Sequence, residues 1–190
     1  MGNVPLKWFY TIPLGPQIQA QWQTPEGANW MRYWNHKTTA IHAKLNRNPG
    51  QPIDIYEDIY DGYRYLEAVK SGHIKKDDTL VLFTLDGAQL YHDKNSDCYF
   101  FVWIILNLSP DFHYKKAYIL PGGFVSGLNP SKKVKSFLLS SFQHVSAIQC
   151  KGGLAIWNAQ KQQVCSSNIF FVASTADTVA LTNLTGFIEH

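Results

Sequence analysis

The stretch that decides the fold runs from Thr79 to Gly87 and reads TLVLFTLDG. Apolar and β-branched residues dominate its first seven positions, as in a β-strand, and Asp86-Gly87 is a turn pair at its end. A second apolar run, YFFVWIIL from Tyr99 to Leu106, is nearly continuous, as expected for a strand buried on both faces. The chain then turns at Ser109-Pro110-Asp111, and residues 116–120 are predicted to form a third strand. Such closely spaced strands favour an antiparallel meander.

A helical period follows the three strands. Between residues 131 and 150, apolar side chains recur at spacings of three and four: Val134, Phe137, Leu138, Phe142, Val145 and Ile148. Gly152-Gly153 is expected to end this helix. A short hairpin is predicted near residues 154–157 and 164, and a last strand over residues 168–173. Three strands, a helix and a parallel return form the first half of a ribonuclease-H-like fold, one of several α/β arrangements that this order permits.

The first fifty residues have a different character, because they are rich in Trp, Tyr and Pro. Thr24-Pro25-Glu26 provides an N-cap, a proline at the first helical position and an acid in the first turn, so a short helix is predicted through about Trp34. A loop at residues 46–52 is the best internal boundary. We therefore expect an aromatic-rich helical extension over residues 1–50 and a partial ribonuclease-H-like core over residues 51–190. Packing of the aromatic side chains onto the core is the simpler interpretation of this extension, and stacking on nucleic-acid bases is the alternative.

The composition is that of a globular intracellular protein. Of 190 residues, 45% are hydrophobic and 16% are charged, which excludes a disordered chain. No apolar run reaches the roughly 18 residues of a membrane span, and no secretory signal is recognisable at the start. The three cysteines are odd in number and form no Cys-x-x-Cys pair. We expect them to be buried, reduced thiols.

The net charge of +3 is too small to indicate a nucleic-acid-binding protein by itself. A local lysine cluster, made of Lys132, Lys133 and Lys135, lies at the predicted start of the long helix, where the helix dipole also favours phosphate. These lysines are the candidate DNA contacts, and a solvated surface cluster is the alternative.

Two aspartates end neighbouring predicted strands. Asp86 ends the first strand, and Asp177 follows the last one. If these strands lie side by side, the two carboxylates converge, and paired carboxylates are the ligands that Mg²⁺ prefers. Two divalent ions held in this way can activate an attacking oxygen and stabilise a leaving one in phosphodiester chemistry. From position alone, however, an ordinary turn role for each aspartate remains the alternative.

Seven stretches, in this order and spacing, resemble the catalytic core of CACTA (En/Spm-like) DNA transposases. They are Phe9–Leu14 (FYTIPL), Met31–Tyr33 (MRY), Asp58–Gly62 (DIYDG), Phe83–Gly87 (FTLDG), Asn107–Pro110 (NLSP), Ile119–Gly123 (ILPGG, similar to a loop before the long helix) and Asp177–Gly186 (DTVALTNLTG). The resemblance implies a ribonuclease-H-like fold, an Asp-Asp-Glu triad with Mg²⁺ or Mn²⁺, DNA and other transposase chains as partners, and the nucleus as location. It makes Asp86 and Asp177 the first two catalytic acids.

The chain also departs from this family. Val179 replaces a proline after the second acid, Gly123 replaces the second proline of Pro-Gly-Pro, and Gln143 and Asn158 stand where acids are common. No residue matches the third acid, since Glu189 is too near Asp177. We therefore expect a transposase core fragment that is inactive in this form and binds metal weakly.

Two other interpretations stay open. The chain could be a non-catalytic module, derived from a transposon, that binds DNA or another protein. It could also be a ribonuclease-H-like nuclease unrelated to transposition, which would need a third acid from within the chain. Asp77, Asp78 and Asp111 are poorly placed for that role.

Overall fold

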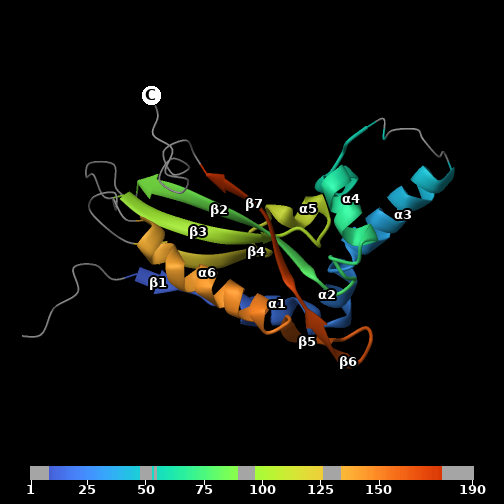
Figure 1. Ribbon diagram of the computed structural model, residues 1–190. Coiled ribbons are helices and arrows are strands. Elements are labelled where there is room, and N and C mark those ends of the chain that lie inside the picture. Colours follow the sequence, from blue (N-terminus) through green and yellow to red (C-terminus); the bar gives the residue numbers. More distant parts are fainter. Residues whose placement is uncertain (1–8, 48–52, 54, 90–96, 126–133, 177–190) are drawn as a thin grey trace, which may run out of the picture.

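The computed structural model describes residues 9–47, 53, 55–89, 97–125 and 134–176. Its centre is a five-stranded sheet in the order β1-β4-β3-β2-β7 (Figure 1). These strands are β1 (Phe9–Thr11), β2 (Thr79–Gln89), β3 (Asp97–Ile105), β4 (Ile119–Val125) and β7 (Ile169–Ala176). β1, β4, β3 and β2 pair antiparallel in turn, whereas β7 runs parallel to β2. The chain therefore has a mixed α/β fold, as expected, with the predicted meander at its centre.

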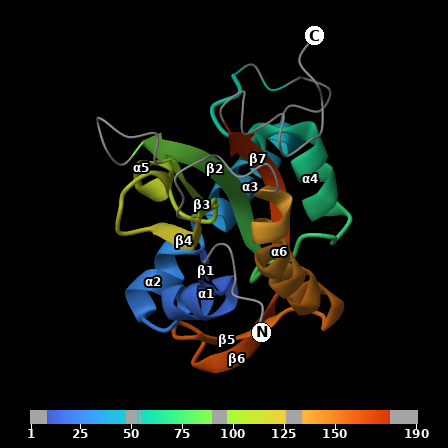
Figure 2. The same cartoon turned by 90° about the vertical axis from the view of Figure 1, so that its left-hand side faces the viewer.

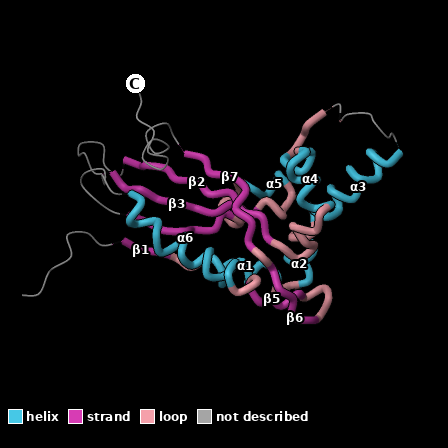
Figure 3. Tube along the Cα trace, viewed as in Figure 1, coloured by secondary structure: helices cyan, strands magenta, loops and turns pink. Residues whose placement is uncertain are grey.

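The remaining elements surround this sheet. The helices are α1 (Leu14–Trp22), α2 (Pro25–Trp30), α3 (Tyr33–Arg47), α4 (Tyr63–Lys70), α5 (Pro110–His113) and α6 (Val134–Cys150), with a 3-10 helix η1 (Ile59–Asp61). The strands β5 (Leu154–Asn158) and β6 (Gln163–Ser167) form the predicted hairpin, which lies next to α1 (Figure 2). Figure 3 shows α3 and α4 together at one end of the sheet. No described helix is long and apolar enough to cross a membrane.

The main core lies on the face of the sheet that α1 and α6 cover. Val81, Phe83 and Leu85 alternate along β2 and are fully buried there, together with Phe101 and Trp103 of β3. On α6 the buried positions are Leu138, Val145 and Ile148, and Phe142 packs against them, as the helical period predicted. Leu14, Ile18 and Trp22 of α1 belong to the same cluster. The stretch expected to form an extension thus contributes a helix to the main core and, through β1, a strand to the sheet.

A second core lies on the other face, at the end of the sheet where β2 begins. Side chains of α3, η1 and α4 pack there against Leu80, Ile104 and Leu106. Tyr60, Tyr65 and Trp34 form edge-to-face ring contacts in this cluster, and Tyr60 donates a hydrogen bond to the backbone carbonyl of Leu106. This packing fixes the two α-helices on one end of the sheet.

The predicted helix start at Thr24 is confirmed, but the single helix predicted through Trp34 is divided into two. The Thr24 hydroxyl accepts a hydrogen bond from the Gly27 amide at 3.0 Å, so Thr24 is the N-cap of α2. The expected single helix through Trp34 is instead two helices, α2 and the longer α3, which begins at Tyr33.

The third strand begins later than predicted. Residues 116–118 belong to a turn, in which Tyr118 donates its backbone N–H to the Lys115 carbonyl, and β4 starts at Ile119. The loop at residues 119–123 that the resemblance implied is therefore wrong, whereas the strand predicted at residues 119 and 120 is confirmed. Glycine makes the strand possible there, because a Cβ on Gly122 would lie only 2.3 Å from the Phe101 ring that packs across it.

The long helix ends where Gly152-Gly153 predicted. α6 ends at Cys150, and Gly152 and Gly153 have positive φ angles of 82° and 116°. Their amides donate to the carbonyls of Gln149 and Ile148, which satisfies the last turn of the helix. The burial of the cysteines was only partly predicted: all three are free thiols, but Cys98 alone is buried and Cys150 is exposed.

Candidate active site

Asp86 lies within β2, opposite Phe100 of β3. The expected turn at Asp86-Gly87 is wrong, because β2 continues to Gln89 and stays paired with β3 there. The side chain of Asp86 is exposed. Because successive side chains of a strand point to opposite faces, Asp86 and Thr84 lie on the face opposite Leu85, away from α6. The helices α3 and α4 cover the other end of this face, and Asp86 itself is exposed.

The second strand expected at the site lies where it was predicted. β7 runs beside β2 in parallel, and Leu85 pairs with Ala176 at the end of the described register. Each proposed acid directly follows one member of this pair in the sequence, since Asp86 follows Leu85 and Asp177 follows Ala176. Asp177 itself lies outside the described residues, so the distance between the two carboxylates is not part of the structure.

Two threonines, which the sequence did not single out, join these strands next to Asp86. The Thr84 hydroxyl donates to the Thr175 backbone carbonyl at 3.1 Å, and the Thr175 hydroxyl donates to the Thr84 hydroxyl at 2.8 Å. Both residues lie on the Asp86 face of their strands, because they pair with each other in the register. Only the strand pairing reveals them, since threonine is common in strands and carries no motif of its own.

The candidate DNA-contacting lysines are only partly described. Lys132 and Lys133 lie outside the described residues, whereas Lys135 is exposed in the first turn of α6. The start of α6 lies at the same end of the sheet as Asp86: Phe137 contacts Phe9 with ring centroids 5.1 Å apart, and Phe9 pairs with Val125. However, α6 covers the opposite face of the sheet. The structure therefore brings Lys135 to the end that carries Asp86, but not to the same face.

The other acids considered for a third ligand lie elsewhere. Asp78 precedes β2 and so lies eight positions before Asp86, roughly 25 Å along an extended strand. Asp78 is buried and accepts hydrogen bonds from the amides of Lys75 and Asn168, and Asp77 forms a 2.6 Å ion pair with Lys161. Asp111 is in α5 and is exposed. These contacts give Asp77 and Asp78 structural roles at the opposite end of β2.

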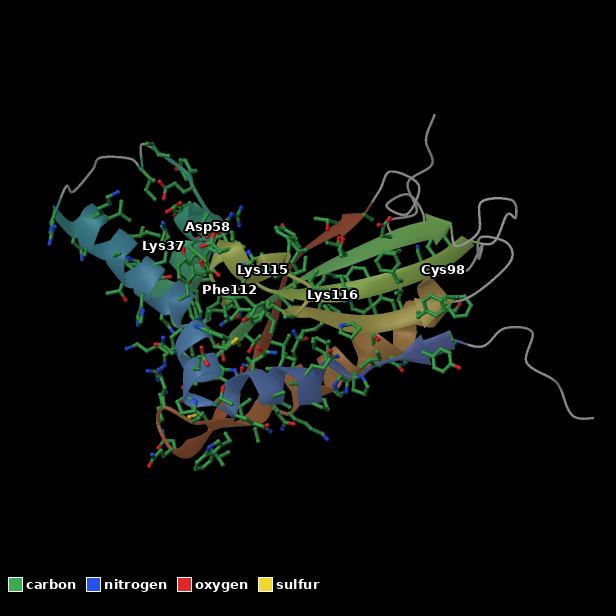
Figure 4. All side chains as sticks on the ribbon, turned by 180° about the vertical axis from the view of Figure 1, so that it is seen from behind. Lys37, Asp58, Cys98, Phe112, Lys115 and Lys116 are labelled. Carbon is green, nitrogen blue, oxygen red and sulfur yellow. The ribbon has the colours of Figure 1, made fainter. Side chains whose placement is uncertain are left out.

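The motif from Asp58 to Gly62 also has a structural role. Asp58 and Asp61 form a capping box around η1, in which the Asp61 carboxylate accepts from the amides of Glu57 and Asp58. Lys37 of α3 pairs with Glu57 at 3.1 Å, and Lys37 and Asp58 lie near each other in Figure 4. The acidic segment thus ties α3 to η1 instead of facing the strand ends.

Asn107 gives the stretch Asn107–Pro110 a structural role. It is fully buried, its amide oxygen accepts from the Leu80 amide at 2.7 Å, and its amide nitrogen donates to the Asp78 carbonyl at 2.8 Å. The side chain therefore continues the β2–β3 pairing beyond the end of the strands. Asn158, which stands where an acid is common in the resembled family, is also buried and donates to Asp77 at 3.4 Å.

Within the described residues, no group of three or more His, Cys, Asp or Glu side chains is arranged to hold a metal ion. Comparisons of the chain with protein-family models, with curated proteins and with solved structures find no significant match.

Proposed function

We propose that this chain is part of the ribonuclease-H-like catalytic core of a CACTA-type DNA transposase. In this proposal Asp86 and Asp177 hold Mg²⁺ or Mn²⁺, the bound metal activates and stabilises the oxygens of a phosphodiester, and transposon-end DNA is the ligand. Lys132, Lys133 and Lys135 supply contacts to the DNA phosphates.

The observation that carries the proposal is the order of the strands around Asp86. β2, β3 and β4 are consecutive antiparallel strands, α6 follows β4, and β7 returns parallel to β2 on its other side. This arrangement supports a ribonuclease-H-like core, because Leu85, the residue before Asp86, pairs with Ala176, the last described residue of β7. Asp86 is exposed, so its carboxylate is accessible to a ligand.

The second candidate is a non-catalytic module that binds DNA or another protein. The exposed apolar side chains of Phe171 and Val172 on β7 favour it, because they offer a protein-binding surface that needs no metal. Metal binding distinguishes the two candidate functions, because only the transposase core requires a bound metal ion.

The test is a titration of the chain with Mn²⁺. Calorimetry measures the binding, and paramagnetic broadening of amide NMR signals locates the bound ion. We expect weak binding, on the order of millimolar, as for open carboxylate sites with few ligands. Broadening should centre on Asp86 and its neighbours, and Asp86→Ala should abolish it. Asp111→Ala is the matched control, because Asp111 is an equally exposed carboxylate far from Asp86. Unchanged Mn²⁺ binding in Asp86→Ala would remove Asp86 from the site and favour the second candidate.

A cleavage assay on transposon-end DNA with Mn²⁺ completes the test. We expect no strand cleavage, since ordering two ions around a phosphate usually needs a third protein ligand. Cleavage by the native chain that disappears in Asp86→Ala would contradict the expected inactivity, and would mean that this chain or a second copy supplies the third ligand.

A further inference from the structure

Helix α6 runs alongside β1 and α1 and contacts both of them (Figure 1). Its Phe137 ring packs edge-to-face on Phe9 of β1, with centroids 5.1 Å apart. One turn further along, the hydroxyl of Ser140 lies 3.2 Å from that of Thr11. After another turn, the His144 ring meets the start of α1. These positions are three and four residues apart, so one side of α6 holds the whole segment.

The contact at His144 fixes the protonation state of its ring. The backbone amide of Gly15 donates a hydrogen bond to Nε2 of His144 at 3.1 Å. A ring nitrogen that accepts a hydrogen bond carries no proton, so the ring is neutral and its proton is on Nδ1. Gly15 is the second residue of α1, and amides at the start of a helix have no partner within the helix. His144 therefore caps α1 from 129 positions away in the sequence.

Protonation of His144 would reverse this contact. The imidazolium has a hydrogen on both nitrogens, so Nε2 could no longer accept from the Gly15 amide. Its positive charge would also face the positive end of the α1 dipole. The packing is close, because a Cβ on Gly15 would lie within 3.4 Å of the side chains of His144, Leu154 and Ile148. The protonated ring therefore has to leave its place or push α1 away.

No described neighbour offers the imidazolium a counter-ion. α6 contacts α1, β1 and β7, and β5 contacts α1. None of these elements contains an aspartate or a glutamate. Their other titratable groups are Tyr10 on β1, which points to the opposite face of the sheet, and Lys135 and Cys150 near the two ends of α6. The charge of a protonated His144 would thus be uncompensated within the part of the chain that the structure describes.

We propose that His144 is a pH-sensitive latch: its neutral ring holds β1 and α1 on α6, and its protonation releases them. Imidazole is the side chain that takes up a proton between about pH 8 and pH 5. The hydrogen bond stabilises the segment above this range and is lost as the pH falls through it, since only the neutral ring accepts. β1 is easily released, because it has only three residues and pairs only with β4 in the described sheet.

This inference goes beyond the proposed function and does not depend on it, because it uses neither Asp86 nor a metal ion. Release of the segment would uncover the edge of β4. It would also remove Leu14, Ile18 and Trp22 from the main core, to which α1 contributes them. The chain would then expose apolar surface in mild acid.

The test is amide hydrogen exchange of the full chain, measured by NMR across this pH range and expressed as protection relative to a free amide. We expect the protection of the Gly15 amide to fall by about tenfold towards the acid end, as for the loss of one hydrogen bond. Amides in the centre of β3 should keep their protection, which distinguishes local release from unfolding of the whole chain.

Two variants separate the role of the proton from that of the side chain. His144→Gln keeps an oxygen that can accept from Gly15 but takes up no proton, so its Gly15 protection should be independent of pH. His36→Gln is the matched control, because His36 is an exposed histidine of α3, and this variant should behave like the native chain.

The ring nitrogen chemical shifts of His144 in the native chain supply a second measurement, which does not need a variant that folds. At the alkaline end of the range they should show a neutral ring with its proton on Nδ1, and at the acid end a protonated ring. A neutral ring with its proton on Nε2, a Gly15 protection that is constant across the range, or an equal fall of protection in His144→Gln would each overturn the proposal.

Discussion

The hydroxyl groups of Thr84 and Thr175 lie 2.8 Å apart and join β2 to β7 one residue before the Leu85–Ala176 pair. The two threonines are 91 positions apart in the sequence, and their strands pair in parallel. This contact holds together the two strand ends that the proposed metal site requires.

Removing the hydroxyl of Thr84 should loosen β7. Thr84→Val keeps the shape of the side chain but loses both hydrogen bonds, which should cost about 0.5–1 kcal/mol in the free energy of unfolding, since the pair is solvent-accessible. Amide hydrogen exchange near Thr175 should become faster. Thr39→Val is the control, because Thr39 bonds only to the Asn35 carbonyl within α3. Equal exchange rates in β7 of both variants would show that the threonine pair does not hold the strand.

The lysine cluster at the start of α6 should govern DNA affinity. We expect weak binding without sequence preference and with strong salt dependence. Changing Lys132, Lys133 and Lys135 together to Ala should lower the affinity and reduce the slope of its logarithm against the logarithm of salt concentration.

Fluorescence anisotropy with labelled duplex DNA measures both quantities. The control removes three exposed lysines elsewhere in the chain, Lys44, Lys70 and Lys151, and so changes the net charge equally. If both triple variants have the same salt slope, the cluster at α6 is ordinary surface.

The buried amide of Asn107 should be among the most sensitive positions of the fold. Asn107→Ala leaves the Leu80 amide and the Asp78 carbonyl without their partner in a dry site. The expected loss is about 2–4 kcal/mol of unfolding free energy. Asn35→Ala is the control: Asn35 also donates to a backbone carbonyl, that of Lys76, but at the surface. Urea unfolding measures both variants, and equal losses would contradict the bridging role of Asn107.

Asp78 should give the stability a recognisable pH dependence. Burial raises the pKa of this carboxyl above its ordinary value of 3.8, although hydrogen bonds from the amides of Lys75 and Asn168 oppose the rise. The folded state therefore binds the proton more tightly than the unfolded state. The contribution of Asp78 to stability is then largest below pH 3.8 and falls as the pH rises through the folded-state pKa.

The difference in unfolding free energy between the native chain and Asp78→Asn isolates this contribution from those of the other carboxylates. We expect that difference to shift in favour of the variant as the pH rises from the acid side to neutrality. A difference that is constant across this range would show that the pKa of Asp78 is the same in the folded and unfolded states.

Local pattern was sufficient to predict the central strands, α6, the β5–β6 hairpin and β7, but it did not predict β1, α1, η1, α4 or α5. The β-branched runs predicted β2 and β3, the spacing of apolar residues predicted α6, and Thr24 and Gly152-Gly153 marked helix ends. These signals are local, because they depend on residues within one or two turns or along one strand. The error at β4 has another origin: the family resemblance implied a loop at residues 119–123, and the packing of Phe101 against Gly122 and Gly123 decided for a strand.

Other properties depended on contacts between residues distant in sequence. The sequence predicted that Asp86 and Asp177 follow neighbouring strands, but only the pairing of Leu85 with Ala176 showed that β2 and β7 lie side by side. The surroundings of the carboxylates also differ in ways that the sequence does not show. Asp78 is enclosed by backbone amides, Asp61 caps a helix, and Asp86 is open to solvent. The sequence by itself determined the identity and order of the elements from β2 to β4 and from α6 to β7, because backbone preferences and side-chain periodicity act locally. The tertiary structure alone decided which carboxylates support the fold and which remain free, because burial and strand pairing join segments that the sequence keeps far apart.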